Sequence, residues 1–233
     1  MRHFSILICL ICFTLGLQAQ EGLKIGLRVS PVFSFGSVVD QEGNDISDDI
    51  SSNAGISYGL NLKYGLTDNY GLLSGVHIVR KGLDRTGMVA TDSAGSVTAA
   101  QDLTVTTVEI PLALRGRSKE IGSGFFITGL FGISLDITAG YKNEFSGLNP
   151  KDDVRVETGT KKNTELVNPV SASFIFGAGV EWDNPTIGVM EFGLTYHRGL
   201  INLNKRSAFD AAARGANESV FLSYLSIDVG YYF

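Results

Sequence analysis

The feature that most constrains this chain is an alternation of apolar and polar side chains that recurs along most of its length. A period of two is typical of β-strands whose two faces meet different environments. In residues 23–35, one phase is mainly leucine, isoleucine, valine and phenylalanine, and the other is mainly lysine, glycine, arginine and serine. The alternation predicts eight strands, over residues 23–35, 55–66, 71–83, 103–117, 125–141, 170–182, 187–200 and 219–233. In the third segment two apolar phases compete, so its register stays open.

The composition indicates what each face can meet. The chain has 28 glycines, only 18% charged residues and a mean hydropathy of +0.14. A face that mixes glycine with charge cannot line an ordinary hydrophobic core, whereas the other face needs an apolar environment. No segment after residue 20 approaches the ~20 apolar residues of a spanning helix. The net charge of -5 and the lack of a basic cluster argue against a nucleic-acid partner.

The connections between the predicted strands alternate in length. Residues 67–70, 118–124 and 183–186 are turn-like, whereas residues 36–54, 84–102, 142–169 and 201–218 form long connections. Long loops gathered at one end are typical of bacterial outer-membrane barrels. The prediction is an all-β fold: an eight-stranded antiparallel transmembrane β-barrel with short periplasmic turns and long extracellular loops. A soluble lipocalin-like barrel, with its apolar face inward around a lipid, is the alternative.

The chain begins with the pattern of a secretory signal peptide. Arg2 and His3 precede an apolar run that ends near Leu17, and the small residue Ala19 supplies a cleavage position. We therefore expect a signal peptide over residues 1–19 and a barrel domain over residues 20–233. Both cysteines would leave with the peptide, which excludes disulfide and thiol chemistry in the mature chain.

The last strand predicts how the barrel is inserted. Val229, Tyr231 and Phe233 occupy one face up to the terminal carboxylate. Such an ending resembles the C-terminal signal that the barrel assembly machinery recognises, and we expect this strand to pair with the first. Outer membrane lipid is the other expected partner. Aromatic residues also gather near strand ends, which predicts interfacial girdles, the outer one formed by Phe33, Phe35, Tyr141 and Phe221.

The polar phase supplies the candidate site. Eight-stranded barrels have interiors just wide enough for side chains to fill. We predict an ion-paired lumen network and no open pore. Its predicted members are Lys24, Arg28, Lys63, Glu109, Arg115, Asp136, Glu181, Glu191, His197 and Asp228.

Five segments carry distinctive motifs: residues 78–82 (IVRKG), 108–114 (VEIPLAL), 126–132 (FITGLFG), 176–181 (FGAGVE) and 196–202 (YHRGLIN). These segments resemble motifs of PorT-like outer membrane β-barrel proteins. VEIPLAL is the most specific, and Ile78 stands where the family usually has an aromatic residue. The resemblance implies a Gram-negative outer membrane protein, in most members without an assigned activity. The founding member is linked to type IX protein secretion, so an envelope or secretion-complex partner is expected, although fold-level likeness does not transfer that role.

An enzymatic role is the functional alternative. A barrel enzyme acting on lipid or peptide at the outer rim would use His197 as base, with Asp136 or Glu191 to orient it and Ser134 or Thr195 as nucleophile. Nothing in the spacing singles these residues out, and we expect no enzyme, no cofactor and no metal. Acidic residues at 40–49 and 152–157 could bind calcium or a basic partner, but their spacing matches no calcium-binding loop.

Overall fold

The computed structural model describes residues 22–39, 50–92, 95–146, 155–160, 167–203 and 219–233. The predicted signal peptide and the acidic segment at 40–49 lie outside these residues. No helix in the described ranges is long and apolar enough to cross a membrane.

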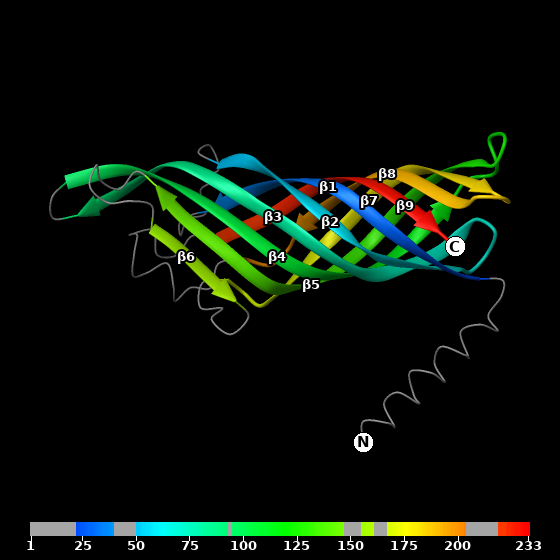
Figure 1. Cartoon of the computed structure of the whole chain (residues 1–233), viewed down its shortest axis with the longest axis horizontal. Coiled ribbons are helices and arrows are strands. Elements are labelled where there is room, and N and C mark those ends of the chain that lie inside the picture. The colour runs from blue at the N-terminus through cyan, green and yellow to red at the C-terminus, as the bar shows by residue number, and fades with distance from the viewer. Residues whose placement is uncertain (1–21, 40–49, 93–94, 147–154, 161–166, 204–218) are drawn as a thin grey trace, which may run out of the picture.

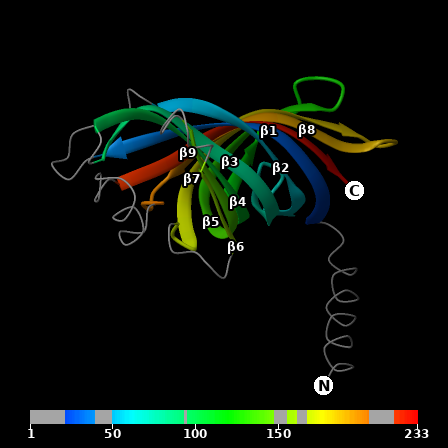
Figure 2. The ribbon, with the colours of Figure 1, turned by 60° about the vertical axis from the view of Figure 1, so that its left-hand side comes forward.

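The described residues form one closed antiparallel barrel (Figure 1). Its strands, together with a short outer strand β6, are β1 (Leu23–Val39), β2 (Ile50–Gly65), β3 (Tyr70–Asp92), β4 (Gly95–Arg117), β5 (Phe125–Ser146), β6 (Arg155–Thr160), β7 (Val170–Asn184), β8 (Gly188–Gly199) and β9 (Ser219–Tyr232). The order is β4-β3-β2-β1-β9-β8-β7-β5, and a β4–β5 pairing closes the ring. The start of β1 and the end of β9 lie at the same end of the barrel in both views (Figures 1 and 2). We call this end, which carries the short turns, the turn end, and the opposite one the loop end.

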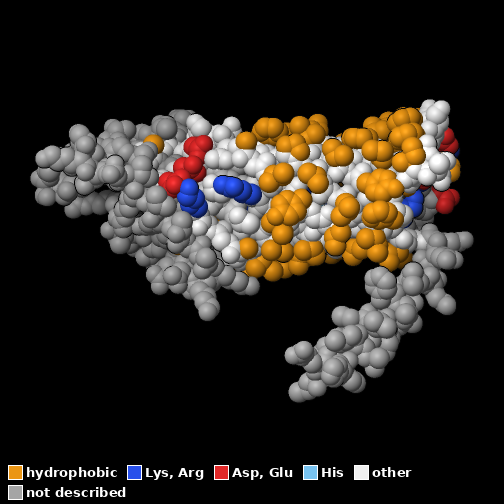
Figure 3. All heavy atoms as spheres, in the orientation of Figure 1, with side chains coloured by type: hydrophobic (Ala, Val, Ile, Leu, Met, Phe, Trp, Pro, Cys, Tyr) orange, Lys and Arg blue, Asp and Glu red, His pale blue; other side chains and the backbone are white. Residues whose placement is uncertain are grey.

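The apolar phase of the strands faces outward. Leu60, Leu112 and Phe131 are 52%, 56% and 55% exposed. Together with equivalent residues on the other strands they form an apolar band around the barrel wall (Figure 3). A barrel of lipocalin type would turn these side chains inward, so the soluble-carrier alternative is wrong. The band is what a lipid-facing surface requires.

Strand β3 has a single phase in the structure. Ile78 is exposed on the outer face, whereas His77 and Val79 are buried inside. The register with β4 pairs Ile78 with Val108 and His77 with Glu109. The competition between the two phases arises because Val79 and Leu73 are apolar residues inside the barrel.

The last strand closes the barrel against the first. Val29 pairs with Val229, and Leu27 pairs with Tyr231. The amide of Phe233 donates a hydrogen bond to the carbonyl of Ile25 at 2.9 Å. The expectation that the terminal strand pairs with the first strand is therefore confirmed, and neither of these strands leaves an open edge over its paired length.

The loop end contains more sheet than the sequence predicts. Residues 84–92 and 95–102, expected as a long loop, extend β3 and β4 as a hairpin. Strand β6, also unexpected, pairs with the end of β5 from Gly140 to Phe145. Beyond the apolar band a strand needs no continuous apolar face, so an alternation that marks membrane strands gives no signal there.

Tyr141 was predicted in the outer girdle, and this prediction is wrong. A register irregularity separates the Thr107–Thr138 pair from the Thr106–Gly140 pair. One extra residue on β5 reverses the side-chain phase beyond it. Tyr141 consequently packs against buried residues in the lumen.

These buried residues form an apolar cluster inside the loop end, which we call the apolar cap. It consists of Leu83, Leu103, Val105, Val167, Leu203 and Leu222. Two members, Val167 and Leu203, lie outside the strands. The amide of Asn168, next to Val167, donates a hydrogen bond to the carbonyl of Leu203 at 2.9 Å, and the amide of Leu203 donates to the carbonyl of Val220 at 2.7 Å. The cap places a hydrophobic layer above the polar lumen.

Candidate functional site

Among the described residues, many charged and hydrogen-bonding side chains lie in the interior of the barrel. Successive inward positions along β4 run from Arg117 and Arg115 at the turn end through Glu109 to Val105 in the apolar cap. The charges therefore lie in layers below the cap. Three networks can be distinguished, each built from strands that are distant in the sequence.

The turn-end network consists of Lys63, Arg115, Glu181 and Glu191. Lys63 Nζ lies 3.0 Å from Glu181 Oε2 and 2.5 Å from Glu191 Oε2. Arg115 contacts the same two carboxylates, at 2.5 Å and 3.4 Å. Two cations and two anions thus neutralise one another. Lys63 also lies 3.5 Å from the centroid of the Tyr232 ring, a cation–π contact.

The central network is organised by Arg28. Its Nη2 atom lies 2.6 Å from Asp228 Oδ1 and 3.1 Å from Ser226 Oγ, and its Nε atom donates to Ser30 Oγ at 3.0 Å. The other oxygen of Asp228 accepts a hydrogen bond from Thr195. The Arg28–Asp228 ion pair joins β1 to β9, the first and last strands of the barrel, and the hydrogen bond from Thr195 connects Asp228 to β8.

The loop-end network consists of Lys81, Glu109, Asp136 and Tyr224. Lys81 Nζ lies 2.6 Å from Glu109 Oε1 and 3.4 Å from Asp136 Oδ2. The Tyr224 hydroxyl donates to Glu109 Oε2 at 2.5 Å. Asp136 also accepts from Ser134 Oγ at 2.7 Å. Glu109 and Asp136 are 1% and 2% exposed, so both carboxylates depend on these partners.

His197 lies against this network without a hydrogen bond among the described residues. Its ring stacks on Tyr224 with centroids 4.1 Å apart, and its Nδ1 atom is 3.9 Å from Glu109 Oε2. The second interior histidine, His77, is bonded instead: its Nε2 atom donates to Asn61 Oδ1 at 2.6 Å. In this arrangement His197 acts chiefly as a packed ring.

The structure places nine of the ten predicted network residues inside the lumen and brings them into the three networks and the His197 contact. Lys24 is the exception, and its assignment to the interior is wrong. Its side chain is 45% exposed at the turn-end rim and lies 3.7 Å from Asp183. Lys24 is the first polar residue of β1, so it precedes the part of the strand that is enclosed.

The sequence leaves Lys81 open as a member of the lumen network, and the structure places it there. The largest contributions that the sequence did not predict come from Tyr224, Tyr232 and Asn61. Tyr232 accepts a hydrogen bond from Asn61 Nδ2 at 2.7 Å. Both tyrosines take the inward phase of β9, one position out of step with the lipid-facing residues, and that phase was the available signal. Gly26 makes room for Tyr232, because a Cβ atom at that position would overlap the ring.

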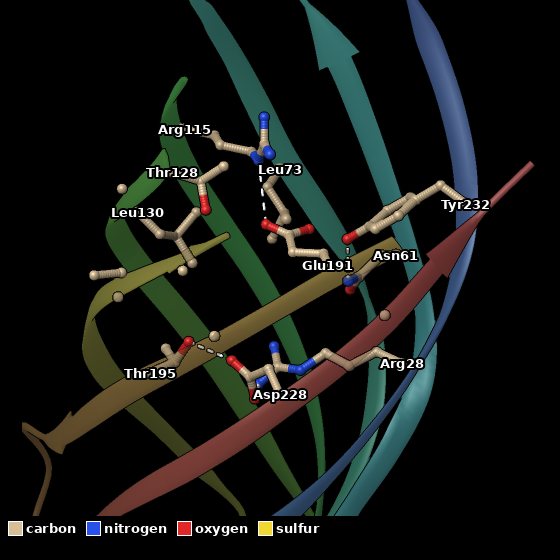
Figure 4. A pocket seen from close by; sticks show the side chains of 16 residues that line it. Arg28, Asn61, Leu73, Arg115, Thr128, Leu130, Glu191, Thr195, Asp228 and Tyr232 are labelled. Carbon is tan, nitrogen blue, oxygen red and sulfur yellow. Dashed lines mark hydrogen bonds and ion pairs between the residues drawn. The ribbon is translucent and has the colours of Figure 1, made fainter. Parts of the chain in front are cut away.

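A small cavity lies between the turn-end and central networks (Figure 4). Arg28, Glu191, Thr195 and Asp228 border it, together with glycines of β7, β8 and β9. Its volume is about 40 Å³, which holds a few water molecules and no larger ligand. The lumen is therefore filled by side chains over this region.

The residues of the enzymatic alternative do not assemble at the outer rim. Ser134, Asp136, Thr195 and His197 are each at most 4% exposed. The carboxylate beside His197 belongs to Glu109, and not to Asp136 or Glu191. Over the described ranges, no group of three or more His, Cys, Asp and Glu side chains is arranged to hold a metal ion.

Three solved structures align with this chain over most of its length. The attachment invasion locus protein Ail of Yersinia pestis aligns at 14% identity with a TM-score of 0.39, over 92% of this chain and 100% of Ail. Neisserial surface protein A aligns at 11% identity with a TM-score of 0.42, over 91% and 100%. The N-terminal barrel domain of Pseudomonas aeruginosa OprF aligns at 11% identity with a TM-score of 0.32, over 89% and 97%. No curated protein matches the chain.

The sequence itself matches a family model. The model describes the outer membrane protein beta-barrel domain, and it aligns with residues 18–205. The match covers most of the chain and seven of the eight barrel strands. This chain therefore belongs to the outer membrane protein beta-barrel domain family.

Proposed function

We propose that this protein is a non-catalytic integral outer membrane protein that acts through contacts with partners and not as an open pore. The roles that fit are a structural protein, a surface interaction protein or an accessory to an envelope or secretion complex. The observation that carries the proposal is the filled lumen, in which three ion-paired networks lie below an apolar cap. A conduit for ions or solutes would require these layers to be absent.

Conductance tests the closed lumen. Purified protein inserted into planar bilayers should give no stepwise currents above background, whereas a porin inserted under the same conditions gives defined steps. Reproducible steps at a constant unit conductance would contradict the proposal. Heat-modifiable mobility on a gel, measured on the same sample, establishes that the inserted protein is folded.

We further propose that the chain lies among the PorT-like members of its family and is exported by its signal peptide. Supporting observations are the VEIPLAL segment in β4 and the apolar N-terminal run. In this proposal the barrel assembly machinery inserts the chain, outer membrane lipid surrounds it, and an envelope or secretion-complex protein is its working partner. Crosslinking in native membranes followed by pull-down should recover one partner in stoichiometric amount. Recovery of the assembly machinery alone would contradict the accessory role.

A further inference from the structure

The turn end of the lumen opens into a cavity of about 400 Å³, which we call the vestibule. This volume lies within the range of ligand-binding pockets, ~300 to 1,000 Å³. Lys63, Arg115 and Glu181 of the turn-end network form its floor. The charged residues of its lining are Lys24, Lys63, Arg115, Arg117, Asp68 and Glu181.

The vestibule lining is richer in cations than in anions. Four of its residues are basic and two, Asp68 and Glu181, are acidic, although the whole chain carries a net charge of -5. At the floor, Lys63 and Arg115 are balanced by two carboxylates. Nearer the mouth, Lys24 and Arg117 both contact the single carboxylate of Asp183, and Asp68 also lies in the lining.

These two cations share one weakly held carboxylate. Lys24 Nζ and Arg117 Nη2 lie 3.7 Å and 3.2 Å from Asp183 Oδ2, and the Asp183 side chain is 36% exposed. Arg117 Nε also lies 3.0 Å from Glu181 Oε1. Ion pairs between exposed groups contribute only ~0 to 1 kcal/mol. A second anion can therefore approach Lys24 and the Nη2 atom of Arg117 by displacing only the exposed Asp183 carboxylate, while Arg117 Nε keeps its contact with Glu181.

The surroundings indicate which anion can reach this position. The apolar cap lies above the polar layers, so a ligand enters from the turn end, which faces the periplasm in this fold. Tyr64, Leu66 and Tyr70 line the vestibule and are 49%, 53% and 58% exposed. Such side chains mark the boundary between lipid and water, where phospholipid headgroups lie. A guanidinium group matches the oxygens of a phosphate in a bidentate manner.

We propose that the vestibule is a binding site for a phosphate group, held between Arg117 and Lys24. The phosphate is that of a phospholipid headgroup of the inner leaflet or of a free phosphate ester in the periplasm. A phosphate group has oxygens on several sides, so different oxygens can contact Lys24 and Arg117 at the same time. The Asp183 carboxylate reaches both cations with one oxygen, at 3.7 Å and 3.2 Å.

Calorimetric titration of the full protein in a phosphate-free maltoside detergent tests the site. Three probes are titrated: inorganic phosphate, glycerol phosphate and a short-chain phosphatidylglycerol. Binding of all three assigns the site to phosphate esters in general, and binding of the lipid alone assigns it to a headgroup. The affinity should fall as sodium chloride is raised. If none of the three probes binds, the proposal is wrong.

Variants locate the binding. Lys24→Gln combined with Arg117→Gln should weaken it by about tenfold or more, which corresponds to ~1.4 kcal/mol, because both charge-assisted contacts to the phosphate are lost. Lys142→Gln is the matched control, because Lys142 pairs with Glu144 at the loop end and lies outside the vestibule. Equal affinities in the double variant and the wild type would overturn the proposal. If the double variant fails to fold, Lys24→Gln alone, at an exposed position, should still weaken binding severalfold, and an unchanged affinity would be equally decisive.

Discussion

At the residue scale, Glu109 shows what keeps charges stable inside this barrel. Its two oxygens accept hydrogen bonds from Lys81 and from the hydroxyls of Tyr224 and Thr107, and the carboxylate is 1% exposed. Burying a carboxylate is costly, and full pairing with good hydrogen bonds offsets the cost. The stability of the loop-end network therefore depends on a complete set of partners.

Glu109→Gln should destabilise the protein by ~3 to 5 kcal/mol, because it leaves the Lys81 ammonium with only the longer contact to Asp136. Urea unfolding in detergent micelles, followed by circular dichroism, measures the free energy of unfolding. The matched control is Glu144→Gln, which breaks the exposed pair with Lys142 and should cost less than ~1 kcal/mol. Similar losses in both variants would show that burial does not govern the effect.

Two adjacent tyrosines allow a comparison of inner and outer hydrogen bonds. Tyr232→Phe removes the acceptor of Asn61 inside the lumen and should cost ~1 to 3 kcal/mol, because a buried amide loses its partner. Tyr231→Phe removes an exposed bond to the carbonyl of Ile187 and should stay within ~0.5 kcal/mol of wild type. The same unfolding experiment measures both, and a larger loss for Tyr231→Phe would contradict the assignment of faces.

At the element scale, strands in the membrane could be predicted and strands beyond it could not. The eight membrane strands each carry one lipid-facing phase, so the sequence alone identified them. The outer parts of β3 and β4 extend beyond the apolar band, and strand β6 is short and polar, so the alternation that marks membrane strands does not identify them. Tyr141 was misplaced because a one-residue irregularity on β5 leaves no mark in the sequence.

The terminal residue of β9 should matter for assembly more than a loop does. Deleting Phe233 removes the backbone bond to Ile25 and the edge-to-face contact with Tyr231, whose centroids lie 5.1 Å apart. The fraction of protein that reaches the outer membrane in a heat-modifiable form should fall well below that of a variant shortened within residues 204–218. If the loop variant assembles more poorly than the deletion, the terminal strand is not the main assembly signal.

The outer hairpin should become more stable as the pH falls. Asp102 pairs in register with Asp84 on β3 and with Glu144 on β5. Partial burial, and then the carboxylates of Asp84 and Glu144, raise the pKa of Asp102 above its ordinary value. A raised pKa means that the folded hairpin binds the proton more tightly than the unfolded chain does. Stability is therefore gained as the pH falls through that pKa, and it is lower at neutral pH.

Amide exchange measures this effect. The exchange rate of the amides around Asp102, divided by the intrinsic rate of the unfolded chain at the same pH, should be lower near pH 4 than near pH 7. Asp102→Asn should slow exchange at pH 7 and reduce the pH dependence, because it removes the central repelling charge. Faster exchange in Asp102→Asn at pH 7 would contradict the repulsion.

At the scale of the whole molecule, the interior links strands that are far apart in the chain. Arg28 and Asp228 are separated by 200 positions, and Lys63 and Glu181 by 118. The residue types of these networks could be predicted from the polar phase. Their pairing could not, because it depends on the stagger of strands around the barrel, and the alternation within one strand does not contain that information.

This linkage predicts a single unfolding transition. The only tryptophan, Trp182, lies on β7 and stacks on Phe125 at the turn end. Its fluorescence and the far-ultraviolet circular dichroism should change at the same urea concentration. The reason is that separating some strands breaks the interior ion pairs of the strands that remain. A fluorescence transition at clearly lower urea would show that the turn end unfolds independently.

The central network has a consequence for how the chain enters a bilayer. An incompletely closed sheet would leave Arg28 on β1 and Asp228 on β9 apart, with each charge facing hydrocarbon or requiring water to follow it into the membrane. Because that intermediate is costly, the two terminal strands must meet before the sheet is released into lipid. The ion pair between β1 and β9 therefore favours insertion of a barrel whose terminal strands have already closed.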